Sequence, residues 1–114
     1  MKIKSLSYIQ QASLQDIYDQ VKGHLLKQKK KSMYNEQCDF ISTDGCRCSV
    51  GCLMSREEAY KYRGLPLDLI EPILELDESR QDLLGLLVDC HDCYRVEDWE
   101  TRLGQIAETY DLVQ

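Results

Sequence analysis

The sequence lacks the short motifs that would assign a chemistry directly. It has no Gly-rich phosphate loop, no Walker lysine, no His-Glu-x-x-His pair and no dinucleotide-binding fingerprint. It also has no apolar run approaching the roughly 18 residues that a membrane-spanning helix requires. The start of the chain, residues 1–7, carries lysines but no apolar signal-peptide core, so we expect no export and a cytoplasmic location.

Histidine is scarce in this chain, whereas cysteine is plentiful. The 114 residues include two histidines and six cysteines. Four cysteines lie within residues 38–52 and two flank the second histidine: Cys38, Cys46, Cys48, Cys52, Cys90 and Cys93. Thiols in a reducing compartment do not form lasting disulfides. We therefore expect these six to be free thiols that are either buried or bound to a metal.

The composition fits a single domain with an uneven charge distribution. Apolar residues make up 43% of the chain, which is enough for one modest core. We expect a lead-in over residues 1–12 and a single domain over residues 13–114. Residues 1–64 carry a formal charge of +4 and residues 65–114 carry −10, which together give −6. An acidic half disfavours binding to nucleic acid and suits a basic protein surface.

The patterns predict an α+β fold that is mostly helical, with about four helices and one small β-hairpin at about residues 38–50. The first helix is expected to begin after Ser13 and the second after a capping box at Ser55. Gly64 is expected to end the second helix. The remaining segments are expected to form a short or broken helix over residues 67–76, a long helix capped by Ser79, and a last helix over about residues 96–110.

The turn signal Asp44-Gly45 defines the predicted hairpin and allows two registers. A two-residue loop places Cys38 on the face opposite Cys46 and Cys48. A three-residue loop gathers one apolar face: Cys38, Phe40, Cys46, Cys48 and Val50. We favour the second register because the buried face determines register, and because it places Gly45 at the left-handed position of a turn with a bulge.

Zinc is one chemistry that these thiols and histidines suggest, because it takes four thiolate or imidazole ligands. The hairpin cysteines could supply four ligands, and Cys90, His91 and Cys93 could supply others. The chain has one Cys-x-x-Cys pair, however, where structural zinc sites often have two. The alternative is that free cysteine behaves as a small, buried apolar residue. The same Cys-x-x-Cys pair does not favour redox chemistry, because it ends a helix instead of beginning one.

Nucleophilic catalysis is the other chemistry considered. Cys52 precedes the second helix, whose N-terminus would favour a thiolate, and His91 could serve as its base. Asp92 is not expected to contact His91, because adjacent side chains on a helix point apart. The alternative is that His91 and His24 are structural histidines. No nucleophile signature of a known family supports the catalytic interpretation.

Three segments resemble a family of small, uncharacterised proteins of tailed bacteriophages. They are the helix from Leu14 to Ser32, the sequence Asp44-Gly-Cys-Arg-Cys-Ser-Val-Gly-Cys-Leu53, and His91-Asp followed by Asp98-Trp99. The resemblance covers most of the chain after residue 12. It implies a phage origin, the cytoplasm of a bacterial host and an accessory role, but no transferable activity.

The family pattern also narrows the candidate metal site. Its cysteines match Cys38, Cys48 and Cys52, and its histidines match His24 and His91, whereas the other three cysteines depart from it. The resemblance therefore implies Cys38, Cys48, Cys52 and His91 as the metal tetrad to test.

From these observations we expect a small, non-enzymatic phage accessory protein that binds a host or phage protein through its acidic C-terminal half. Such a protein would serve host takeover or counter host defence, with no membrane or nucleic-acid partner and with its oligomeric state open. The alternatives are a zinc-stabilised binding module, and a hydrolase or transferase that uses Cys52 and His91.

Overall fold

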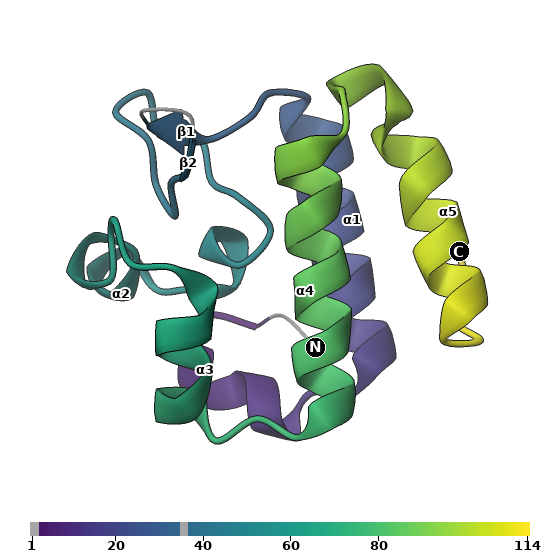
Figure 1. Cartoon of the computed structure of the whole chain (residues 1–114), viewed down its shortest axis with the longest axis horizontal. Coiled ribbons are helices and arrows are strands. Elements are labelled where there is room, and N and C mark those ends of the chain that lie inside the picture. The colour runs from purple at the N-terminus through teal and green to yellow at the C-terminus, as the bar shows by residue number, and fades with distance from the viewer. Residues whose placement is uncertain (1–2, 35–36) are drawn as a thin grey trace.

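Three helices form the central bundle of the protein. The computed structural model describes residues 3–34 and 37–114, without the side chains of residues 34, 37, 38 and 73. The bundle helices are α1 (Leu14–Gln28), α4 (Glu78–Cys93) and α5 (Trp99–Thr109), and each contacts the other two. Figure 1 shows α4 in front of α1, with α5 beside the pair and running back in the opposite direction.

Helix α1 forms where the sequence predicted it. The Ser13 hydroxyl accepts a hydrogen bond from the Asp16 amide at 3.0 Å, so it caps the helix as expected. The buried face follows the helical period and consists of Ile17, Tyr18, Val21 and Leu25. The predicted N-cap of α4 was wrong by two residues, since Asp77 and not Ser79 caps that helix.

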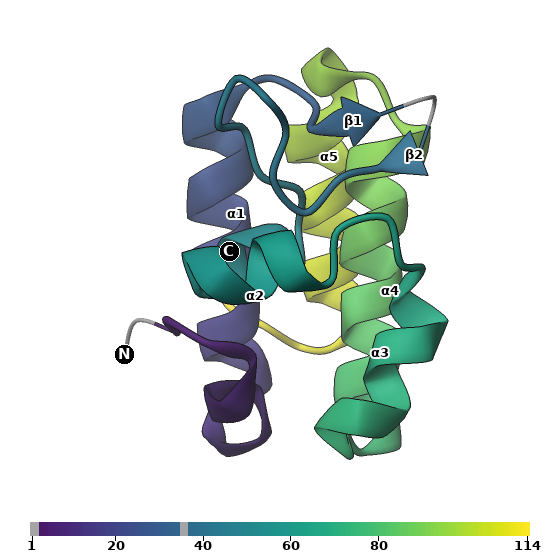
Figure 2. The ribbon, with the colours of Figure 1, turned by 90° about the vertical axis from the view of Figure 1, so that its left-hand side faces the viewer.

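A second layer of short helices covers one side of the bundle (Figure 2). It contains the 3-10 helices η1 (Leu6–Gln11) and η2 (Gly51–Leu53) and the α-helices α2 (Arg56–Lys61) and α3 (Leu67–Leu74). The capping box at the start of α2 is confirmed, with Ser55 and Glu58 each accepting a backbone hydrogen bond from the other. Helix α2 ends at Lys61, and the left-handed Gly64 (φ +84°) follows it.

The first residues of the described chain belong to the same core as the bundle. Ile3, Leu6, Ile9 and Ala12 are all buried. The guanidinium group of Arg80 on α4 donates hydrogen bonds to the carbonyl groups of Ile9 and Ala12. Residues 3–12 are therefore packed on the domain by side chains and by backbone hydrogen bonds.

The fold is all-α, so the prediction of an α+β fold with a hairpin over residues 38–50 was wrong. Extended pairing in the described chain is limited to the two-residue segments β1 (Met33–Tyr34) and β2 (Gln37–Cys38), in which Met33 pairs with Cys38. The expected turn at Gly45 is present, with φ +85°, and one backbone pair closes it between Ser42 and Cys46. No ladder of hydrogen bonds continues from that pair through the described residues up to 50.

A helix that crosses a membrane must be both long and apolar. None of the helices formed by residues 3–34 and 37–114 meets both requirements.

Candidate functional site

Residues 39–53, here called the thiol loop, replace the predicted hairpin and carry three of the six cysteines. Side chains of α1 bind the backbone of this loop at Arg47. The Nε2 atom of His24 and the side-chain amide of Gln28 each donate to the Arg47 carbonyl at 2.9 Å. The Gln28 carbonyl oxygen accepts from the Arg47 amide at 2.8 Å. The backbone groups that a strand partner would have satisfied are thus satisfied by helix side chains.

Ser32, which is completely buried, connects the beginning of the thiol loop to its middle. Its hydroxyl lies 2.6 Å from the carbonyl oxygen of Asp39 and 2.9 Å from that of Cys46. The Asp39 amide in turn donates to the Ser32 carbonyl at 2.9 Å. On the far side of the loop, the hydroxyl of Ser49 donates to the Leu87 carbonyl of α4 at 2.7 Å. Polar contacts therefore attach the loop to the bundle at several points.

Two further features of the loop could not be read from its sequence. The Asp39 side chain is only 2% exposed. It forms an ion pair with Arg63, in which Nη2 of Arg63 lies 3.1 Å from Oδ2 of Asp39. The favoured hairpin register had placed Asp39 on the solvent face. At Gly51 the backbone passes so close to residue 40 that a Cβ atom would lie 2.0 Å from the Phe40 carbonyl oxygen. Residues 39–41 and 48–51 of the loop are buried, whereas its tip, residues 43–45, is exposed.

The thiols of Cys48 and Cys52 lie close together in the loop. Cys48 is buried, and its sulfur accepts a hydrogen bond from the Gly51 amide at 3.3 Å. The Cys52 thiol donates to the Ser49 carbonyl at 3.1 Å. Burial, with a smaller contribution from Cys48, raises the pKa of the Cys52 thiol far above its ordinary value. This environment opposes the thiolate that the helix N-terminus had been expected to favour.

The other cysteines are dispersed. Cys90 is buried in α4, and burial raises the pKa of its thiol to about 11. Burial also raises the pKa of Cys46, while Cys93 is exposed at the end of α4. Cys38 is the second residue of β2, and its side chain lies outside the described part of the structure.

His91 is fully buried and both of its ring nitrogens are hydrogen-bonded. Its Nε2 atom accepts from the Ser32 amide at 2.9 Å, and Nδ1 lies 2.5 Å from Oδ1 of Asp92. Because an amide can only donate, Nε2 carries no proton, and the ring is the tautomer that donates from Nδ1. The imidazole also stacks on Trp99, with ring centroids 5.6 Å apart. His91 thus joins the segment that follows α1 to α4 and α5.

The contact between His91 and Asp92 differs from the expectation that adjacent helical side chains point apart. It occurs in the last turn of α4, which ends at Cys93. Serine, histidine and aspartate here resemble a catalytic triad in composition but not in geometry. Ser32 offers its amide to the imidazole, while its hydroxyl is directed to two carbonyl groups. A nucleophile would need its hydroxyl at the imidazole.

The structure describes the side chains of three residues of the candidate metal tetrad, Cys48, Cys52 and His91. Cys48 and Cys52 are neighbours, whereas His91 uses both nitrogens within the protein, so neither nitrogen is free to bind a metal. Among the side chains that the structure describes, which do not include that of Cys38, no three of histidine, cysteine, aspartate or glutamate are placed to hold a metal ion. Gln28 and Ser32 were not predicted to be part of the site. Polar residues near the end of a lysine-rich helix are usually exposed, so nothing in their pattern indicates contacts with the thiol loop.

The second histidine leads to a prediction about pH. Burial lowers the pKa of His24, whose Nε2–H donates to the Arg47 carbonyl. The unfolded chain, with a histidine pKa near 6.5, then takes up a proton before the folded protein does. The stability from His24 is complete above about pH 6.5 and falls as the pH drops toward the lower folded pKa.

The measurement is the free energy of unfolding between about pH 7.5 and about pH 5, in the wild type and in His24→Gln. Glutamine keeps a donor for the Arg47 carbonyl but does not titrate. We expect the wild type to lose more stability than the variant over this interval. Equal pH dependence in the two proteins would contradict the prediction.

The acidic half forms an exposed surface. Eleven of the thirteen carboxylates in residues 65–114 are exposed. At 100° per residue, Glu78, Asp82 and Asp89 fall on one stripe of α4, here called the acidic stripe. None of these three joins an ion pair in the described chain. Burial, together with the charges of Asp68 and Asp82, raises the pKa of Glu71 on α3, so the negative field extends from α4 to α3.

The arginines of this half do not neutralise the acidic stripe. Arg80 is directed to backbone carbonyl groups and to Asp77. Arg95 pairs with the carboxylates of Glu97 and Asp98 at the start of the last helical segment. Arg102 donates to the Gln105 side chain and lies over the Tyr94 ring. The stripe therefore presents uncompensated negative charge to solvent.

Comparison with known proteins does not add a functional assignment. No family model, curated protein or solved structure gives a significant match to the chain.

Proposed function

We propose that the chain is a small phage-encoded accessory protein that binds a basic surface of a host protein in the bacterial cytoplasm. In this role it redirects a host process or counters a defence, and it catalyses no reaction. The sequence resemblance to tailed-phage proteins supports the phage origin. The observation that carries the binding role is the acidic stripe and the exposed carboxylates around it.

Two physical arguments support this proposal. Like charges on one face repel each other, and binding of a partner of opposite charge relieves that repulsion. Attraction between the opposite charges also raises the association rate of the partner. In addition, the side chains that suggested catalysis are engaged within the protein. His91 is hydrogen-bonded at both nitrogens, and Cys52 sits where burial opposes the thiolate.

The test compares the host proteins captured by three forms of the protein from bacterial lysate. Asp82→Asn with Asp89→Asn removes two charges of the acidic stripe. Asp19→Asn with Glu57→Gln removes two exposed charges elsewhere and is the matched control. We expect the wild type and the control to capture the same basic protein, and the stripe variant to retain it at least about fivefold less, as two weak surface ion pairs would give.

Salt provides a second readout, because screening weakens exposed charge pairs. We expect capture to decrease as the salt concentration rises in the wild type, and less steeply in the stripe variant. Equal capture by the stripe variant and the control would contradict the proposal, as would the absence of any specific partner.

A further inference from the structure

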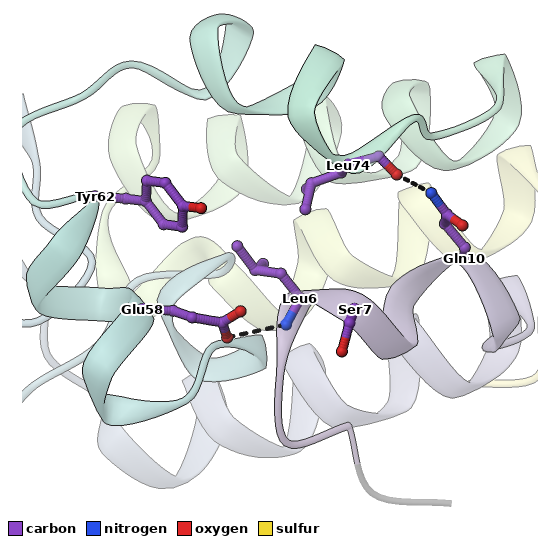
Figure 3. A pocket seen from close by; sticks show the side chains of 6 residues that line it. All are labelled: Leu6, Ser7, Gln10, Glu58, Tyr62 and Leu74. Atoms are coloured by element: carbon purple, nitrogen blue, oxygen red, sulfur yellow. Dashed lines mark hydrogen bonds between the residues drawn. The ribbon is translucent and has the colours of Figure 1, made fainter.

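A pocket of about 310 Å³ lies between η1, α2 and α3 (Figure 3). Its lining residues are Leu6, Ser7, Gln10, Glu58, Tyr62 and Leu74. The side-chain amide of Gln10 donates to the Leu74 carbonyl and joins the end of α3 to η1. Leu6 and Leu74 are buried, so they give the pocket an apolar floor. The pocket is separate from the thiol loop described above.

Glu58 gives this pocket a negative charge. One carboxylate oxygen, Oε1, accepts hydrogen bonds from the amides of Leu6 at 3.0 Å and Ser55 at 2.9 Å. No hydrogen bond within the described chain uses the other oxygen, Oε2. Figure 3 shows this oxygen turned toward the space between Tyr62 and the Leu6 side chain. The two backbone bonds hold the carboxylate in place, which leaves one oriented acceptor for a ligand.

The rest of the lining contains no cationic side chain. The Tyr62 hydroxyl points into the same space in Figure 3, whereas the Ser7 hydroxyl is paired with Ser5 at 2.8 Å. The ammonium of Lys61 lies 5.3 Å from the centre of the Tyr62 ring, so this ring already attracts a cation. Lys61 forms no ion pair with Glu58 in the described structure.

We infer that this pocket receives an arginine or lysine side chain of the partner protein. The aliphatic stem would pack on Leu6 and Leu74, and the charged end would donate to Oε2 of Glu58 and to the Tyr62 hydroxyl. A hydrogen bond between ionised groups is about twice as strong as a neutral one, which makes the pocket selective for a cation. The inference rests on the proposed function, in which the partner is a basic protein.

The probe is the capped peptide acetyl-Gly-Arg-Gly-amide, with the neutral isostere acetyl-Gly-citrulline-Gly-amide as its control. Binding is followed through the amide signals of Leu6 and Ser55 in ¹H–¹⁵N spectra, because both amides donate to Glu58. We expect the arginine peptide to shift these signals in a saturable way and the citrulline peptide to leave them unchanged.

Glu58→Gln removes the charge but keeps an oxygen for both backbone bonds, and we expect it to weaken peptide binding about tenfold. Tyr62→Phe keeps the ring and should weaken binding about threefold, as loss of one modest hydrogen bond would. Glu57→Gln, an equal charge change on an exposed neighbour, should leave binding unchanged. Equal response to the citrulline peptide, or unchanged binding in Glu58→Gln, would overturn the inference.

The pocket and the acidic stripe can fail separately. If the Glu58→Gln protein still captures the host protein and the stripe variant does not, the pocket inference is overturned. The proposed function is then unaffected. Failure of every form to capture a basic protein would overturn the proposed function, and with it the assignment of the side chain to a partner.

Discussion

Replacing Gly51 with alanine is expected to lower the free energy of unfolding by about 3 kcal/mol or more, at the upper end of what overpacking produces. An alanine Cβ would lie 2.0 Å from the carbonyl oxygen of Phe40 and 2.8 Å from its carbonyl carbon. Both atoms are backbone, so no side-chain rotation can relieve the clash. The thiol loop would have to move away from residue 40, which would disturb the buried Cys48 and Val50 beside it.

Chemical denaturation measures this effect, and the chain offers matched controls. Gly23 in α1 and Gly85 in α4 have no neighbouring atom within 4 Å of a built Cβ. Alanine at either position should therefore raise stability by about 0.5–1 kcal/mol, because it favours the helix. A Gly51→Ala protein as stable as the wild type would show that the two loop segments are not in contact.

Replacement of His91 is expected to have the second large effect on the free energy of unfolding. His91→Phe keeps an aromatic ring against Trp99 but leaves the buried Ser32 amide without an acceptor, which should cost about 1–3 kcal/mol. His91→Ala also removes the ring from a fully buried position, and the loss should rise to about 3–5 kcal/mol. The difference between the two variants separates packing from hydrogen bonding.

Asp92→Asn is the control for the histidine variants. Asparagine keeps an oxygen that can accept from Nδ1 of His91, so we expect a loss below about 1 kcal/mol. All four proteins are compared by equilibrium unfolding in urea. A His91→Ala protein with unchanged stability would contradict the structural role of this residue.

The helices could be predicted from the sequence because their signals are local. The cap at Ser13, the capping box at Ser55 and the helical spacing of the apolar residues in α1 each depend on residues within one or two turns. Placement of the α4 cap at Ser79 failed because Asp77, two residues earlier, offers an equally good acceptor. Such errors move a helix end without changing the fold.

The hairpin was predicted wrongly because the loop that forms in its place depends on contacts between residues that are distant in the sequence. The turn at Gly45 is real, and alternation of apolar and polar residues around it suggested two strands. The hydrogen bonds that determine the outcome come from His24, Gln28 and Ser32, which are 14 or more residues away from their partners at Cys46 and Arg47. No pattern within residues 38–50 reveals that those side chains are available.

The candidate site shows the same limitation. Cys48, Cys52 and His91 could be selected by residue type, but their chemistry depends on contacts that the sequence does not specify. The Ser32 amide and the Asp92 carboxylate form hydrogen bonds with the two ring nitrogens of His91. Burial raises the pKa of Cys52, whereas the helix dipole was expected to lower it. The acidic stripe could be anticipated in part, because the charge imbalance between the two halves is a property of composition.

We infer that His91 stabilises the fold and acts neither as a metal ligand nor as a base. Long-range ¹H–¹⁵N spectra of the imidazole rings test this role, because they report the protonation of each ring nitrogen. At neutral pH we predict a neutral His91 ring with its proton on Nδ1, an unprotonated Nε2, and no change on addition of one equivalent of Zn²⁺. A zinc-dependent shift of Nε2, or a proton on that atom, would contradict the structural role of His91.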